Sequence, residues 1–512
     1  ITAWHVSQGY ADVRVSAADV DRPAGRGFSV GFRIEEGPRY VLDRVTVDST
    51  VGDFPIRPRL RSGDVLSPHA LRAEAERLAD AAFAGGIRRI AVIPRVTRHA
   101  DGRADVEFHV DRAGPAYVER IEIEGNHRTR DVTLLRELDF AEGDAFDTVL
   151  VRRARKRLEA TGHFDAVRIV ASQGASEDRV RVTVAVRERK SGELSVGGGY
   201  STKDGPIANL VLGDTNLSGT GRAARASVTR GDGSTAFSFA FREPALLGTR
   251  ASGRTEAFHT TGDRSAGGFT AYREDRTEGS LSVGLPVNGP LSLTLSYSAA
   301  FRNLSAVDPR LTGNGSPSAP DLVRPGSSLR SSLGYALSYD GREAGKGFVT
   351  TFGQDVAGLG GDVRQLKTEA TAAATTGRLP SGVEATLSGR AGHLASLGGE
   401  IAFPDHFRAG PDFVRGFAMD GFGPRDGSTG YHLGGTAYAQ ATAEVTFALP
   451  LLPEAYGFRG AAFVDAGSVW RPDGALMPGV SGFGSSSTTR TMYSGSLTGN
   501  PARKALKRLS FE

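Results

Sequence analysis

The sequence predicts an α+β repeat region followed by an antiparallel β-barrel that spans a membrane. Three observations support this fold class: an internal repeat in the first 190 residues, alternating strands after it, and many glycines. The chain has 512 residues, of which 39% are hydrophobic and 67 are glycine. This composition is typical of a β-rich protein with small side chains and many turns. The net charge of +4 is modest, so we expect no nucleic-acid partner.

A membrane helix is not expected, because no apolar run approaches the roughly 18 residues that such a helix needs. Only a β-barrel could therefore span a bilayer, since every backbone polar group must be paired inside lipid. The chain begins with ITAWHVSQGY, without Met or a signal peptide. We expect a mature product or a fragment whose start lies upstream.

The N-terminal part repeats itself. The segment FRIEEGPRYVLDRVTVDST around Tyr40 matches FHVDRAGPAYVERIEIEGN around Tyr117. A helical pattern follows each copy, and each unit closes with two alternating strands. The predicted order is strand, helix, helix, strand, strand, with helices covering one face of the sheet. The expected domains are 37–114 and 115–190, with 1–36 as the tail of a preceding copy.

A three-stranded sheet of this kind leaves exposed edges, and an edge can accept an extended peptide by β-augmentation. In the last repeat the sequence VRIVAS is the predicted edge. Its residues are Val167, Arg168, Ile169 and Val170. A tandem array without any binding site remains the alternative.

The region 191–470 predicts barrel strands of about 9–13 residues separated by polar turns. The best example is TAYAQATAEVTFAL, in which apolar residues alternate with polar ones and Glu444 lies on the polar face. The segment FRGAAFVDAGSVW likewise places Asp465 on the polar face. Apolar-out, polar-in alternation indicates a membrane barrel with a wet lumen. A soluble β-sandwich is the alternative, but strand length, a charged inner face and long loops favour the barrel.

Enzyme signatures were sought directly. The sequence contains no H-E-x-x-H or G-x-x-x-x-G-K-[ST] motif. Its ten histidines are scattered without ligand spacing, and it has no cysteine for disulfide or thiol chemistry. We therefore expect no enzyme, no catalytic residue, no metal and no cofactor.

Several motifs resemble one family. YVERIEIEGNHRTRDVTLLREL, EGDAFD, GELSVGGGYST, NLSGTGR, FVRGFAMDGFGPRD and FVDAGSVW are similar to the outer-membrane protein assembly factors of the BamA family. The resemblance covers about residues 1–470, and the repeats would be polypeptide-transport-associated (POTRA) domains. The related TamA family is the nearest rival.

The resemblance implies that the loop carrying the VRGF signature folds into the barrel lumen. Its Arg would pack against acidic side chains of the wall and act as a strut, while glycines allow the tight reversal. The strut would comprise Val414, Arg415, Gly416, Phe417, Glu444 and Asp465. The loop turn would comprise Gly421, Gly423, Pro424, Arg425 and Asp426.

The resemblance also implies a function. The chain would insert β-barrel proteins into the bacterial outer membrane, with POTRA domains in the periplasm. Its partners would be unfolded outer-membrane proteins, accessory lipoproteins and outer-membrane lipid. A loose seam would begin at the first strand, at Gly197, Gly198, Gly199 and Tyr200. A TamA-like factor, a two-partner secretion transporter and a passive pore remain alternatives.

The segment 471–512 departs from the family pattern. We count about 13 strands up to Trp470, whereas bacterial single-chain barrels have an even number and this family has sixteen. The last strands are therefore expected to be missing. A frameshifted or truncated gene, a poor sequence read and a wrong strand count remain open as explanations.

Overall fold

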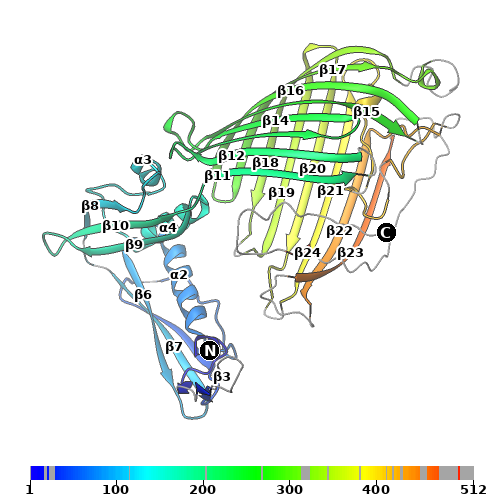
Figure 1. The fold of residues 1–512 in the computed structure, drawn as a ribbon. Coiled ribbons are helices and arrows are strands. Elements are labelled where there is room, and N and C mark those ends of the chain that lie inside the picture. The colour runs from blue at the N-terminus through cyan, green and yellow to red at the C-terminus, as the bar shows by residue number, and fades with distance from the viewer. Residues whose placement is uncertain are drawn as a thin grey trace. The chain divides into compact units, whose positions relative to one another are not determined.

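The computed structural model divides the chain into two compact units, Ile1–Lys190 and Ser191–Glu512, and each unit is described separately (Figure 1). The structure describes residues 2–471 and 494–495. The gaps within that range are 17–19, 22–28, 31, 53, 113, 115, 202–204, 267–268, 313–322, 343–344, 380–381, 411, 418–419, 427–429 and 450–457.

The first unit opens with a short helix and a hairpin. The two halves of the hairpin pair in antiparallel fashion, β1 with β4 and β2 with β3. These elements are α1 (Thr2–Ser7), β1 (Arg14–Ser16), β2 (Val20–Asp21), β3 (Ser29–Val30) and β4 (Arg33–Glu35).

The first repeat forms a three-stranded sheet in the order β5-β7-β6, with one helix. The helix begins where Ser67 caps it, because the Ser67 side chain accepts a hydrogen bond from the Ala70 N–H. Two helices were predicted, but the described residues of this repeat contain one. Pro55 and Pro58 lie where the other helix would be, and proline removes a helical donor. The elements are β5 (Val41–Ser49), α2 (Pro68–Ala84), β6 (Ile90–Arg98) and β7 (Arg103–Arg112).

The second repeat has the predicted order of strand, helix, helix, strand, strand. Its sheet order is β8-β10-β9, so β9 lies at one edge of the sheet. The core packs Leu134 and Leu158 of the helices against Val182 and Val184 of the central strand. The elements are β8 (Tyr117–Glu124), α3 (Asp131–Leu135), α4 (Thr148–Ala160), β9 (Phe164–Gln173) and β10 (Arg179–Glu188).

The two repeats contact each other through α2 and α4. Val149 packs against Phe83, and Arg152 forms an ion pair of 2.7 Å with Asp80. Asp147 caps α4 through the Val149 N–H and also accepts the N–H of Arg89 at 3.0 Å. One carboxylate therefore serves both the helix and the junction.

The second unit is one large antiparallel sheet whose strands pair in chain order from β11 to β24. The strands β11 to β23 are thirteen in number, which agrees with the predicted count up to Trp470. Figure 1 shows the sheet curving, so that β12 and β14 pass in front of β18 and β20. Among the described residues, β11 has a strand partner on one side only, and the sheet is therefore not closed there.

The strand bounds of this sheet are β11 (Gly192–Ser201), β12 (Gly205–Leu217), β13 (Arg222–Arg230), β14 (Ser234–Glu243), β15 (Ser252–Ala266), β16 (Phe269–Asn288), β17 (Leu291–Ser305), β18 (Gly326–Asp340), β19 (Gly347–Gly361), β20 (Gln365–Thr375), β21 (Glu384–Ser396), β22 (Ala437–Ala448), β23 (Phe458–Trp470) and β24 (Ser494–Gly495). Three short 3-10 turns accompany them: Leu246–Gly248, Pro309–Leu311 and Phe403–Asp405.

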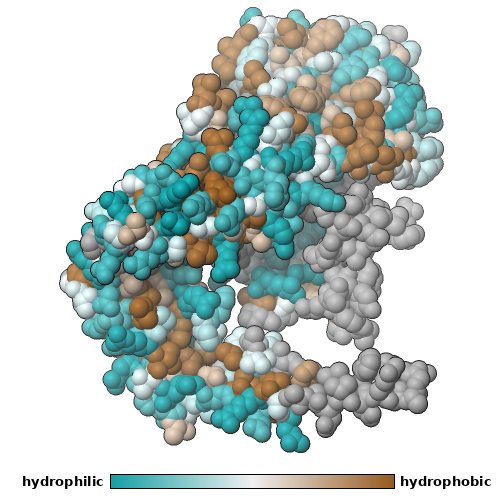
Figure 2. Space-filling view, turned by 60° about the vertical axis from the view of Figure 1, so that its left-hand side comes forward, coloured by the Kyte–Doolittle hydropathy of each residue, from teal (hydrophilic) through white to brown (hydrophobic). Residues whose placement is uncertain are grey.

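The strands show the predicted alternation. In β22, Ala439, Ala441 and Ala443 are exposed, while Thr442 and Glu444, which alternate with them, are partly buried. Large apolar side chains also lie on the outer face, and Figure 2 shows hydrophobic residues spread over the visible surface of the sheet. An apolar outer face with a polar inner face fits a bilayer-spanning sheet.

Within the part of the chain that the structure describes, every helix is too short or too polar to cross a bilayer. The atypical segment predicted at 471–512 lies outside the described residues, apart from Arg471 and the short strand β24.

Candidate functional site

The loop between β21 and β22, residues 397–436, carries the VRGF signature. It folds back on itself: Phe407 bridges to Gly435, and Arg425 bridges to His432. The backbone adopts a positive φ at Gly416 (94°) and Gly423 (106°). A Cβ at Gly423 would lie 3.0 Å from Nε2 of His432, so both conformation and space favour glycine there.

The turn that was predicted from the sequence is held by backbone hydrogen bonds. The Leu433 N–H donates to the Pro424 carbonyl at 2.8 Å, and the Asp426 N–H donates to the Tyr431 carbonyl at 2.8 Å. Nη2 of Arg425 donates to the Asp420 carbonyl at 2.8 Å. The turn continues through Gly421 and Gly423, and Asp426 is 1% exposed.

Arg415 lies at the centre of the site. Its backbone N–H and Nε donate to Oδ2 of Asp465 at 3.1 and 2.7 Å, and Nη2 donates to Oδ1 at 2.7 Å. Nη1 donates to Oε2 of Glu444 at 2.6 Å. The structure thus brings together the arginine and both acidic side chains that the sequence singled out. Hydrogen bonding to Asp465 and Glu444 raises the pKa of Arg415, so the loop carries a permanent positive charge here.

The wall that receives Arg415 consists of neighbouring residues of β22 and β23. Thr442 pairs with Asp465, and Glu444 pairs with Phe463, so all four side chains share one face. The Thr442 hydroxyl donates to Asp465 at 2.9 Å, and the guanidinium lies 3.3 Å above the Phe463 ring. The Asp465 side chain is 3% exposed, whereas that of Glu444 is 33% exposed. The contact with Asp465 is therefore the more desolvated of the two.

Apolar side chains of the loop pack beside this ion pair. Val414 belongs to a cluster with Phe413 and Phe422 of the loop and with Tyr438 and Val469 of the wall, and Phe417 lies against it. The sequence analysis missed one residue of this contact, Gly467 of β23. A Cβ at Gly467 would approach the Phe413 ring to 2.7 Å, so only glycine lets the loop lie this close. A glycine inside a strand is the signal that could have indicated this approach.

A second attachment was also missed by the sequence analysis. Arg302 of β17 contacts Glu274 of β16 at 3.1 Å and Asp405 of the loop at 2.9 Å. All three side chains are nearly buried, with exposed fractions of 12%, 7% and 5%. Tyr272 and Leu304 pack there against Tyr431 and other apolar loop residues. No sequence motif marks these partners, because they are distant in the chain.

Two buried histidines belong to the loop rather than to a metal centre. Nε2 of His432 donates to the Phe422 carbonyl, and Nδ1 accepts the Gly434 N–H at 3.2 Å. Nδ1 of His406 donates to the Leu433 carbonyl at 2.9 Å. Burial lowers the pKa of both histidines, which keeps them neutral at physiological pH. Among the described residues, no group of His, Asp and Glu side chains is arranged to hold a metal ion.

The predicted seam lies at the free edge of the sheet. Gly197, Gly198 and Gly199 pair in regular register with Asn209, Ala208 and Ile207 of β12. Tyr200 is 79% exposed.

The predicted edge residues of the second repeat lie in β9. Val167 is buried, Ile169 is partly buried, and Arg168 and Val170 are exposed. The edge strand is thus an element of the first unit, whereas the signature loop belongs to the second.

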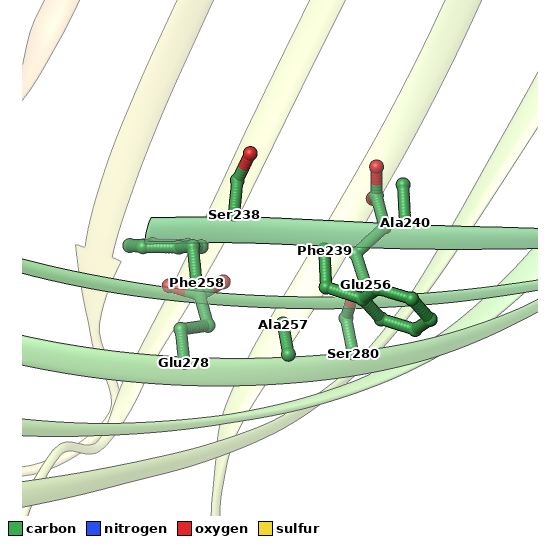
Figure 3. A pocket seen from close by; sticks show the side chains of 8 residues that line it. All are labelled: Ser238, Phe239, Ala240, Glu256, Ala257, Phe258, Glu278 and Ser280. Atoms are coloured by element: carbon green, nitrogen blue, oxygen red, sulfur yellow. The ribbon is translucent and has the colours of Figure 1, made fainter. Parts of the chain in front are cut away.

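A cavity of about 220 Å³ lies on the sheet between β14, β15 and β16 (Figure 3). Its two carboxylates already have cationic partners: Glu256 contacts Arg254 at 2.5 Å, and Glu278 contacts Arg276. This cavity therefore offers no free charged group for a ligand. The lining residues are Ser238, Phe239, Ala240, Glu256, Ala257, Phe258, Glu278 and Ser280.

Comparison with known protein families gives two matches. Residues 216–499, more than half of the chain, match the Omp85 superfamily domain. The chain belongs to the Omp85 superfamily. Residues 116–189 match the POTRA model, which is described as a surface antigen variable number repeat. The Omp85 match extends beyond residue 470, where the sequence resemblance was expected to end.

Relatives support the same family. The chain is 27% identical over 478 residues to the outer membrane protein assembly factor BamA of Neorickettsia risticii, covering 91% of this chain and 63% of the relative. It is 23% identical to BamA of Neisseria meningitidis, covering 92% of this chain and 62% of the relative. The chain thus spans less than two thirds of the length of these relatives. The resemblance to BamA and the expected outer-membrane location agree with these matches.

A solved structure supports the fold. The crystal structure of BamA from Haemophilus ducreyi lacking POTRA domains 1–3 matches with a TM-score of 0.55 and 21% identity. The match covers 84% of this chain and 88% of the other. The predicted fold class, POTRA repeats followed by a large antiparallel barrel-type sheet, is confirmed.

Proposed function

We propose that the chain assembles β-barrel proteins and inserts them into the bacterial outer membrane, without catalysing a covalent reaction. The observation that carries this proposal is the Omp85 match, in a chain whose residues 116–189 also match the POTRA model. The substrates would be unfolded outer-membrane proteins. Accessory lipoproteins and outer-membrane lipid would be further partners, as the resemblance to BamA implies.

We further propose that Arg415 acts as a strut between the loop and the wall. A single guanidinium that binds two carboxylates fixes the loop in both position and orientation, because its donors form a planar fork. Val414, Gly416 and Phe417 would support this contact. The strut would keep the signature loop against the inner face of the sheet while substrate strands are added elsewhere.

The remaining proposals concern where substrate binds. The β9 edge would receive an extended substrate segment in the periplasm by main-chain hydrogen bonding. The free edge of β11 would then template the incoming strand in the membrane, since an unpaired edge in lipid must find a partner. Gly197, Gly198 and Gly199 would make this strand easy to displace, because glycine adds no side-chain packing.

Two experiments test the proposed function. First, the full-length protein is depleted in its source cell, and several unrelated outer-membrane proteins are quantified. Loss of all of them supports a general assembly factor, whereas loss of a single exported protein supports a two-partner transporter and contradicts the proposal.

Second, the full-length protein is reconstituted in vesicles with an unfolded barrel protein as substrate. Protease-protected, heat-modifiable substrate should appear only when the chain is present. Steady ion conductance without substrate insertion would instead support a passive pore.

A further inference from the structure

The two repeats of the first unit present similar sheet edges. In the first repeat the edge strand is β6, and in the second it is β9. Both strands pair with a central strand whose buried residues correspond. Pro94 of β6 lies opposite Phe108, and Ile169 of β9 lies opposite Val184. Pro94 and Ile169 therefore occupy equivalent positions.

The proline lies where the edge would need a donor. In the first repeat the His99 N–H donates to the Arg103 carbonyl at 2.8 Å, which makes this a hydrogen-bonded pair. Such pairs alternate along an antiparallel ladder, and the register from Arg98 back to Ile90 has no shift. The backbone groups of Pro94 therefore point away from β7, toward the free edge. Proline has no N–H, so this edge lacks a donor at its centre.

The corresponding edge of the second repeat has all of its backbone N–H donors. The Gly174 N–H donates to the Arg179 carbonyl at 2.8 Å, so the same alternation points the backbone groups of Val167, Ile169 and Ala171 toward the free edge. Each of these residues has an N–H. Extended chain could therefore add to β9 with an unbroken set of main-chain hydrogen bonds.

Side chains near this edge define which segment would fit. On the helix-covered face, Val167 is buried and Ile169 packs against the core. On the open face, Arg168 of β9 lies opposite Ala185, and Arg187 of β10 lies opposite Ala166, so the two arginines are diagonal neighbours. Both are exposed, and neither has an acidic partner within the described residues. A neighbouring strand would meet apolar side chains on one face and positive charge on the other.

We infer that β9, and not β6, accepts an extended amphipathic segment that alternates apolar and polar residues and carries a carboxylate beside Arg168. This inference rests on the proposed function and deepens it by excluding the first repeat and by naming the chemistry of the segment. The alternation matches that of barrel strands, which the chain itself illustrates in β22. Pro94 excludes the same segment from the first repeat.

The absence of cysteine from the chain allows a direct test by disulfide trapping in the full-length protein. Cysteine is introduced by Ser172→Cys in β9 or by Thr97→Cys in β6. These exposed residues are matched, because each lies three residues after its equivalent, Ile169 or Pro94. The probes are synthetic ten-residue peptides of alternating Val and Thr with a terminal cysteine. One carries a central Asp on the polar face and the other a central Lys.

We expect the Asp peptide to be trapped at Ser172→Cys at least about fivefold more than at Thr97→Cys, which corresponds to one backbone hydrogen bond. Adding Pro94→Ala to Thr97→Cys should remove most of this difference. At β9 the Asp peptide should exceed the Lys peptide by about threefold, and Arg168→Glu should reverse that preference. Circular dichroism of each variant checks that the repeats remain folded.

Equal trapping at both edges with Pro94 present would overturn the role of Pro94. If Arg168→Glu leaves the preference for the Asp peptide unchanged, the proposed contact between Arg168 and a carboxylate of the segment is refuted. If no peptide is trapped at β9 but the reconstituted chain still inserts barrel proteins, the inference fails and the proposed function stands. Loss of insertion activity in the unmodified chain would instead refute the proposed function.

Discussion

Removing the guanidinium of Arg415 should release the signature loop from the wall. Arg415→Ala deletes two donors to Asp465 and one donor to Glu444, and leaves Asp465 with the Thr442 hydroxyl and one backbone N–H. Leaving a nearly buried carboxylate without its cation costs about 3–5 kcal/mol. The more exposed Glu444 adds at most about 1 kcal/mol. The population of the released loop should then rise about a thousandfold, since each 1.4 kcal/mol is a factor of about ten.

Limited proteolysis of the full-length protein in detergent measures this release. Trypsin sites remain at Arg408 and Arg425 on either side of the substitution, so a released loop is cut there. When opening and closing are faster than cleavage, the cleavage rate follows the population of the open form. Arg342→Ala is the control, because Arg342 pairs across an exposed hairpin turn with Asp340 two residues away.

A double-mutant cycle identifies the cause of the release. Arg415→Ala and Asp465→Ala should show a coupling of about 2–3 kcal/mol, because each residue is the other's main partner. Arg415→Lys should give partial protection, since one ammonium cannot reproduce the two-pronged contact. Cleavage of Arg415→Ala no faster than that of Arg342→Ala, or additive effects in the cycle, would refute the strut.

Three further predictions concern other parts of the chain. Gly197→Val should slow substrate insertion by up to about fivefold, because valine favours the strand form of β11. Gly279→Val, at an equally open site within the paired sheet, should not slow it. Equal insertion rates for the two variants in the vesicle assay would argue against a labile seam. Burial alone would raise the pKa of Glu188, but hydrogen bonds from a neighbouring threonine and two backbone N–H groups lower it. The stabilisation by Glu188 is therefore present above about pH 4.3 and is lost as pH falls through the lowered pKa. Glu188→Gln should consequently flatten the fall of Tm in acid. An unchanged dependence of Tm on pH would contradict this role of Glu188. Asp147→Ala should cost about 1–2 kcal/mol and speed hydrogen exchange at the junction of the repeats. Ser67→Ala is the control, because it removes a helix cap whose side chain accepts a hydrogen bond from Ala70 of its own helix, and it should leave the junction protected. Similar exchange in both variants would contradict the shared role of Asp147.

Much of the second unit could be predicted because a strand has a period of two. Alternation in TAYAQATAEVTFAL placed Glu444 on the inner face, and alternation in FRGAAFVDAGSVW did the same for Asp465. Neither pattern shows that the two carboxylates meet one arginine, because that depends on how the loop returns. The resemblance to a family supplied Arg415, and the structure brings the three residues together.

Other features depend on position in three dimensions, which local patterns do not encode. The missing helix of the first repeat could have been noticed at Pro55 and Pro58, since proline opposes a helix interior. The contact of Arg302 with Asp405 joins residues 103 apart in sequence, so no local period could indicate it. Gly467 reads in the sequence as one more small residue of a strand, and only the approach of Phe413 gives it a role.

Because the loop has two attachments, we expect it to stabilise the sheet as well as itself. One attachment joins the loop to β16 and β17 through Arg302, and the other joins it to β22 and β23 through Arg415. The loop thus connects the middle of the sheet to its last long strands. The strand β11, at the other edge, makes neither of these two attachments. Loss of Arg415 should therefore speed hydrogen exchange in β22 and β23 while exchange in β11 and β12 remains unchanged. The reason is that only β22 and β23 lose their contact with the loop, and no strand-to-strand pairing replaces that contact.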